Sequence, residues 1–171
     1  MREALELLEE RGAAEIAHPG GTLLAHLRRV SGLLEQWGAR PVLQAAGLCH
    51  AFYGTDGFAT ALGDVTRREE LVAAIGGEAE RLVYFYASCD RKFSYPRLRD
   101  GDFRDRFTRA VVVPPWPMRR DFAELTVANE LDVFAHNEEL RARYEDESLR
   151  LFASWNDLLS APARKAAGIA G

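Results

Sequence analysis

Apolar residues recur with a helical period along almost the whole chain. In residues 22–37 one stripe of apolar side chains returns every three or four positions and the opposite side is charged, which predicts an amphipathic helix. Glycine, proline and capping residues divide the pattern into helices at about 2–10, 22–37, 41–53, 66–75, 78–87, 119–142 and 145–158. The sequence therefore predicts an all-α bundle of about six or seven helices.

Residues 91–118 interrupt this pattern. Asp100-Gly101 is a turn signal, and residues 110–113 could form a short strand. We predict that these residues form an irregular insertion and that one β-hairpin is its regular element. Residues 91–120 contain nine Arg or Lys and three Asp, within a chain of net charge −4. The Ala- and Gly-rich tail, residues 160–171, is expected to fray.

Composition bounds the class of protein. With 171 residues, 47% of them hydrophobic and 28% charged, residues 1–171 are expected to form one globular domain. No apolar run approaches the roughly 20 residues of a membrane-spanning helix, and the first residues do not resemble a signal peptide. Two cysteines, Cys49 and Cys89, are expected to be reduced thiols in a cytoplasmic protein. The mild acidity argues against nucleic-acid binding, and the oligomeric state stays open.

Two histidines fall where the pattern predicts core. His26 lies within the apolar stripe of helix 22–37, and His50 lies on a helix that is apolar nearly all round. A buried polar group without a partner costs about 1–3 kcal/mol. A metal ion, or a carboxylate shared by the two histidines, would supply such a partner. The alternative is that they are two unrelated core histidines. His18, in the turn before helix 22–37, is either a substrate contact or a surface residue.

The loop after His50 carries three further candidates, Tyr53, Thr55 and Asp56. Its glycines allow close backbone approach, and the alternative is a glycine turn with a capping Asp.

Helix 119–142 adds both an acidic residue and a polar stripe. Glu124 falls on its apolar side and could pair with Arg91 or with a histidine. Asn129, Asp132 and His136 stack on another side. That stripe is either a set of ligands or a solvated face, and the solvated face is favoured for Asp132 and His136.

The motifs Thr22-Leu-Leu-Ala-His26-Leu-Arg-Arg-Val and Ala46-Gly-Leu-Cys-His50 resemble the opening of the HD-domain superfamily of metal-dependent phosphohydrolases. The resemblance covers roughly residues 15–135. The stretch from His18 to Arg91 is more specifically similar to an HD-like family of unknown function. It implies a helical bundle in which a His, a His-Asp pair and a later Asp surround a divalent metal.

When the ligand positions of the superfamily are matched motif by motif, the resemblance implies that His26, His50 and Asn129 are metal ligands. Ala51 stands where the Asp of the His-Asp pair is expected, and Asn129 stands at the position of the last Asp. Because two negative charges are lost, the resemblance implies a weak or absent site for a divalent metal.

Three functions remain open at this stage. The first is an HD-like enzyme acting on a small anionic metabolite in a histidine-lined pocket, with metal-dependent hydrolysis as one form. The second is a metal-free acid/base catalyst (isomerase, lyase or cyclase), and the third is a non-catalytic protein that binds a small molecule. The candidate catalytic residues are His18, His26, His50 and Asp56. The candidate substrate-binding residues are Tyr53, Thr55, Arg91 and Glu124. Arg91, with Arg106 as a second candidate, would hold an anionic group of the substrate; the alternative is that the arginines of the insertion pair with the acidic helices that follow it.

Overall fold

The computed structural model describes residues 1–169 and is mostly helical, as predicted. Its helices are α1 (Arg2–Glu10), α2 (Leu23–Gln36), α3 (Pro41–Cys49), α4 (Glu69–Ile75), α5 (Gly77–Ala87), α6 (Arg91–Ser94), the 3-10 helix η1 (Tyr95–Arg97), α7 (Trp116–His136), α8 (Glu138–Ser154) and α9 (Ala161–Ala166). Two antiparallel hairpins are formed by β1 (Ala17–His18) with β2 (Gly21–Thr22) and by β3 (Phe103–Arg104) with β4 (Val111–Val112). The nine α-helices within residues 1–169 exceed the six or seven predicted.

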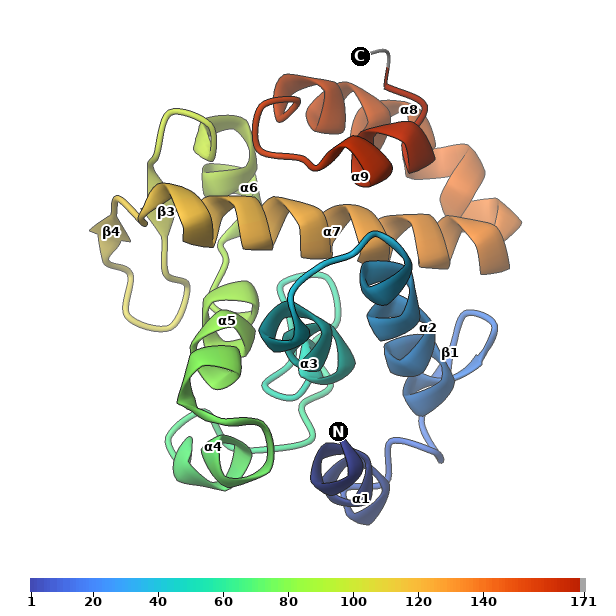
Figure 1. Cartoon of the computed structure of the whole chain (residues 1–171), viewed down its shortest axis with the longest axis vertical. Coiled ribbons are helices and arrows are strands. Elements are labelled where there is room, and N and C mark those ends of the chain that lie inside the picture. The colour runs from blue at the N-terminus through green and yellow to red at the C-terminus, as the bar shows by residue number, and fades with distance from the viewer. Residues whose placement is uncertain (170–171) are drawn as a thin grey trace.

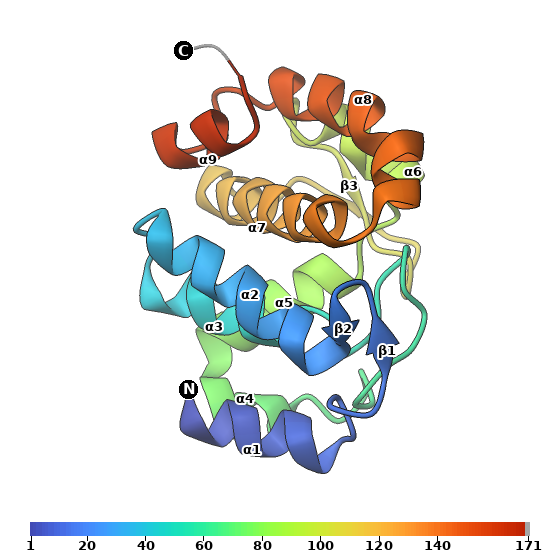
Figure 2. The same cartoon turned by 90° about the vertical axis from the view of Figure 1, so that its right-hand side faces the viewer.

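Helix α7 runs through the middle of the molecule between two groups of helices (Figure 1). On one side lie α2, α3 and α5, with α1 and α4 beyond them, and on the other side lie α8 and α9 (Figures 1 and 2). Because α7 is covered on both sides, every residue from 122 to 129 is buried. Polar residues in this stretch are therefore held inside the protein.

Several predicted boundaries agree with the structure. Thr22 caps α2 by accepting a hydrogen bond from the backbone N–H of Ala25 at 3.2 Å, as its position predicts. The hairpin expected in the basic insertion is β3–β4. The hairpin β1–β2, in contrast, lies where only a turn was predicted.

Other boundaries were wrong. The break between the two last long helices lies at Asn137, not between residues 142 and 145, because the Asn137 side chain accepts a hydrogen bond from Leu140 N–H and starts α8. Helix α3 ends at Cys49, and residues up to Tyr53 form a turn.

The expected fraying of the tail was also wrong for the described part. Ser160 caps α9, and Ala163 and Ala167 are buried, so the tail packs on the protein. Residues 170–171 lie outside the described residues. In the part of the chain that the structure describes, no helix has the length and apolar character needed to cross a membrane.

Candidate functional site

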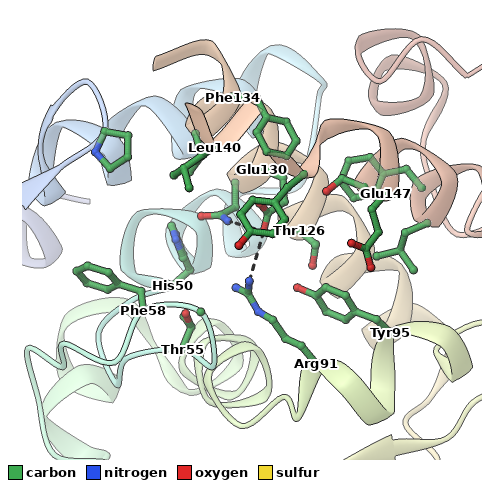
Figure 3. Close-up of a pocket in the computed structure, with 18 of the residues that line it drawn as sticks. His50, Thr55, Phe58, Arg91, Tyr95, Thr126, Glu130, Phe134, Leu140 and Glu147 are labelled. Carbon is green, nitrogen blue, oxygen red and sulfur yellow. Dashed lines mark hydrogen bonds and ion pairs between the residues drawn. The ribbon is translucent and has the colours of Figure 1, made fainter. Parts of the chain in front are cut away.

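A cavity of about 1120 Å³ opens where the β1–β2 hairpin, the end of α3, α6, α7 and α8 meet. Figure 3 shows side chains from these elements around a common space, with His50 and Phe58 on one side and Tyr95 on the other. Three of the four histidines, His18, His26 and His50, line it. The prediction that His26 and His50 are buried is confirmed, since they are 1% and 2% exposed.

His26 belongs to a buried hydrogen-bond network around Asp132. The helical period of α2 places His26 on the face toward α7, where its Nδ1 lies 2.7 Å from Oδ2 of Asp132. Arg29, one turn further along α2, donates to both oxygens of the same carboxylate, from Nε at 2.7 Å and Nη2 at 3.0 Å. With its Nδ1 facing the carboxylate, His26 directs Nε2 toward Oδ1 of Asn129 at 3.1 Å. Asn129 itself lines the cavity.

His50 lies beside His26, with 5.2 Å between the ring centroids and the planes nearly perpendicular. Its Nδ1 lies 2.8 Å from the backbone oxygen of Gly47. A carbonyl oxygen can only accept, so Nδ1 carries the proton in the neutral ring. The lone pair of His50 is therefore on Nε2.

His18 stacks on His26 from the β1–β2 hairpin, with ring centroids 4.0 Å apart. Arg29 fixes this hairpin by donating to the backbone oxygens of Pro19 at 2.9 Å and Gly20 at 3.3 Å. Nδ1 of His18 is buried without a hydrogen-bond partner among residues 1–169. His18 is thus a cavity residue and not a surface turn residue.

Burial sets the protonation of this cluster. Burial, followed by the neighbouring His26, lowers the pKa of His18 to about 4 and the pKa of His50 to about 3. Burial acts to raise the pKa of Asp132, but hydrogen bonds from His26 and Arg29 outweigh it and lower that pKa to about 2. At neutral pH the site thus holds a carboxylate and two uncharged imidazoles that can accept protons.

Two other predicted residues reach the cavity. Arg91, at the start of α6, points its guanidinium into the space and pairs with Glu130 Oε1 at 3.4 Å (Figure 3). Gly57 allows this position, because a Cβ there would lie 2.6 Å from Nη1 of Arg91. Thr55 lines the wall beside His50.

Two predicted loop residues lie outside the cavity lining. Asp56 accepts a hydrogen bond from the backbone N–H of Arg91 at 3.0 Å, so its carboxylate holds the start of α6. The hydroxyl of Tyr53 donates to Glu80, which is also bound by Arg68. These contacts correct both predictions, because the turn after Cys49 directs the two side chains away from the histidines.

The predictions for Glu124 and Arg106 also need correction. Glu124 accepts hydrogen bonds from the Ser160 hydroxyl at 2.5 Å and its N–H at 3.1 Å, so it attaches α9 to α7 instead of binding Arg91 or a histidine. Nε of Arg106 donates to the backbone oxygen of Ala87 at 2.7 Å. Of the nine basic residues in 91–120, Arg91 and Lys92 line the cavity.

The sequence interpretation missed Asp132, Arg29 and Tyr95 as site residues. A solvated position was favoured for Asp132, yet it is 3% exposed. The available signal was its spacing of three residues from Asn129, which places both side chains on one face of α7. His136 fits the solvated interpretation better: its side chain is 34% exposed and its Nδ1 bonds the backbone oxygen of Asp132 at 2.8 Å.

The donors that could hold a metal are few. Two imidazoles sharing an ion at about 2 Å from each nitrogen have ring centroids roughly 5 Å apart, as His26 and His50 do. The stacked rings of His18 and His26 cannot both direct a nitrogen at one ion. Asp132 is already bound by Arg29 and His26. Within residues 1–169 no three His, Cys, Asp or Glu side chains are grouped to hold a metal ion, so the available set is His26, His50 and the Asn129 amide, which includes no carboxylate.

Comparison with known proteins gives one match. A family model described as a domain of unknown function, DUF6817, matches residues 7–91. This range includes His18, His26, His50 and Arg91 but not the α7 residues Asn129 and Asp132. No curated protein and no solved structure matches the chain significantly.

Proposed function

We propose that the protein is an enzyme that transfers protons on a small anionic molecule bound in the histidine-lined cavity. The observation that carries this proposal is the buried His26–Asp132 pair, in which the carboxylate lies 2.7 Å from Nδ1, while Nε2 faces Oδ1 of Asn129, a residue of the cavity lining, at 3.1 Å. A carboxylate in this position fixes the tautomer of the imidazole and stabilises the imidazolium formed when Nε2 takes a proton. His26 is therefore the acid/base residue of the proposal.

The two neighbouring imidazoles supply further proton acceptors. His50 donates its Nδ1 proton to the backbone oxygen of Gly47, so its lone pair is on Nε2. Nδ1 of His18 has no hydrogen-bond partner in the described structure. Isomerisation, elimination and cyclisation all need one group to remove a proton and another to return one. A set of three adjacent imidazoles, of which His26 alone is paired with a carboxylate, fits reactions of that kind.

We also propose that the fold is HD-like. Support comes from the meeting of His26, His50 and Asn129 at the cavity, because the sequence resemblance implies these three positions as neighbours. The loss of the two acidic positions, at Ala51 and Asn129, then separates this chain from the metal-binding pattern of that superfamily.

A metal-dependent hydrolase is the second candidate function. The ring spacing of 5.2 Å between His26 and His50 favours it, with Asn129 as the third donor. A bound divalent ion would supply an activated water in such an enzyme. A donor set without a carboxylate predicts weak binding.

Turnover of a panel of small carboxylates and phosphate esters, followed by NMR with and without EDTA, tests the two candidates. We expect a turnover that survives EDTA and falls about 10²–10⁴-fold in Asp132→Asn, the range typical of general acid/base catalysis. The variant Arg99→Met, which removes a surface pair with Asp157, is the control and is expected to be fully active. Turnover that requires added Mn²⁺ or Fe²⁺ would instead favour the hydrolase.

The imidazole tautomers provide a test that needs no substrate. We expect ¹⁵N spectra to show a proton on Nδ1 of His26, hydrogen-bonded to Asp132. A neutral His26 carrying its proton on Nε2 would contradict the proposed acid/base role.

A further inference from the structure

The cavity has two chemically different ends. The polar end holds the histidines and the guanidinium of Arg91. The other end, opposite Arg91 in Figure 3, is formed by Phe134 and Leu140 at the α7–α8 corner.

The polar end has hydrogen-bond donors that are incompletely used. Within residues 1–169 the one carboxylate on the Arg91 side chain is Glu130, and its distance of 3.4 Å exceeds the about 2.7–2.9 Å of a strong charge-assisted bond. The hydroxyl of Tyr95, whose ring centroid lies 5.6 Å from the Arg91 guanidinium, is buried without a partner in the described structure. A guanidinium beside an unused O–H donor is suited to an oxyanion.

The charged side chains that line the cavity include more basic than acidic residues. Arg91, Lys92 and Arg150 line the cavity together with two acidic residues, Glu130 and Glu147.

The apolar end is a groove beneath α8. It is lined by Val133 and Phe134 of α7 and by Leu140, Tyr144 and Leu151 of α8. Tyr144 is 40% exposed, so the groove opens to solvent along α8. A wall of this composition binds the apolar part of a ligand, since each buried methylene contributes about 0.8 kcal/mol.

We propose that the ligand of the cavity is an amphipathic anion, with a carboxylate or other oxyanion held by Arg91 and Tyr95 and an apolar chain or ring lying under α8. This inference rests on the proposed function and names its substrate class. At about 1120 Å³ the cavity is larger than a small polar metabolite requires, because typical ligand sites measure roughly 300–1,000 Å³.

Isothermal titration with three matched probes tests the inference. Octanoate carries both features, acetate lacks the apolar chain, and octan-1-ol lacks the charge. We expect octanoate to bind at least tenfold more tightly than either of the others. Binding requires no turnover, so a protein that binds octanoate but catalyses nothing would refute the proposed chemistry and leave this inference standing.

Single substitutions test which end of the cavity binds the carboxylate of octanoate and which end binds its apolar chain. Arg91→Met should weaken octanoate binding at least tenfold and leave octan-1-ol within threefold. Tyr95→Phe, which keeps the ring, should weaken octanoate severalfold without disturbing the fold. Leu140→Glu should weaken octanoate and leave acetate unchanged. Arg99→Met is the control, because its partner Asp157 lies on the surface.

Three results would overturn the inference. They are equal binding of octanoate and octan-1-ol, equal binding of octanoate and acetate, and no detectable octanoate binding at millimolar concentration. If Arg91→Met fails to fold, a Tyr95→Phe variant with unchanged preference for octanoate over octan-1-ol refutes the anion site.

Discussion

At the scale of single residues, the buried charge of Asp132 determines the geometry of the site. Its carboxylate is 3% exposed and has two partners on α2, His26 and Arg29. A buried carboxylate is tolerated only when it is paired and hydrogen-bonded. The same pairing orients His26 and, through the bonds of Arg29 to Pro19 and Gly20, holds the hairpin that carries His18.

Replacement of Arg29 by Met tests this arrangement. Removing one partner of a buried ion pair leaves the other charge uncompensated and typically costs about 3–5 kcal/mol. Arg29 is 27% exposed, so we expect the lower part of that range from urea denaturation. Its neighbour Arg28 forms a surface pair with Glu9, and Arg28→Met should cost less than about 1 kcal/mol. Equal losses in the two variants would contradict the role assigned to Arg29.

At the scale of secondary-structure elements, the surroundings of α7 decide what its polar residues do. Helix α7 is covered by α2, α3 and α5 on one side and by α8 and α9 on the other (Figure 1). Asn129 and Asp132 consequently face the histidines, whereas Glu124 faces α9 and binds Ser160. One helix thus contributes both to the site and to the attachment of the C-terminal helix.

Replacement of Ser160 by Ala tests the second of these roles. The variant loses the N-cap of α9 and the hydroxyl bond to Glu124, and each loss typically costs about 1 kcal/mol. We expect a free energy of unfolding lower by about 2 kcal/mol and unchanged octanoate binding. Ser154→Ala, whose exposed hydroxyl bonds Leu151 O, should change stability by less than half as much. A loss of octanoate binding in Ser160→Ala, but not in Ser154→Ala, would contradict this assignment and indicate that Glu124 contributes to ligand binding.

At the scale of the whole molecule, the buried histidines couple stability to pH. The pKa of His50 is lowered from 6.5 to about 3 and that of His18 to about 4. Between these values and 6.5 the unfolded chain binds more protons than the folded chain, so the free energy of unfolding falls as pH falls. Asp132 acts in the same direction at lower pH, because its folded pKa of about 2 lies below the unfolded value of 3.8.

We therefore expect the melting temperature to decrease steadily from pH 6.5 to pH 4. Each histidine held uncharged contributes a slope of up to about 1.4 kcal/mol per pH unit. The variant His50→Gln can still donate to Gly47 but has no titrating ring, so its melting curve should depend less steeply on pH. A variant profile parallel to that of the unmodified protein over this range would show that His50 is charged, or exposed, in the folded state.

The sequence by itself determined the mostly helical character, the position of α2 and the burial of the histidine pair. Periodicity fixed α2, and the position of His26 within its apolar stripe predicted that this side chain faces the interior, because a helix repeats every 3.6 residues regardless of its partner. The apolar run of α3 likewise predicted a buried His50. The motif resemblance brought Asn129 to the same site, where its Oδ1 lies 3.1 Å from His26.

Only the tertiary structure decided which polar residues share the site. The pattern along α7 does not reveal that Asp132 faces His26 and Arg29 of α2 or that Glu124 faces Ser160 at the start of α9. A solvated face was therefore favoured for Asp132, and a ligand role was predicted for Glu124. The directions of Tyr53 and Asp56 depend on the turn after Cys49, which is fixed by contacts with Glu80 and the start of α6. Local periodicity records which face of a helix is apolar. It does not record which element will cover that face, because that depends on contacts between residues far apart in the chain.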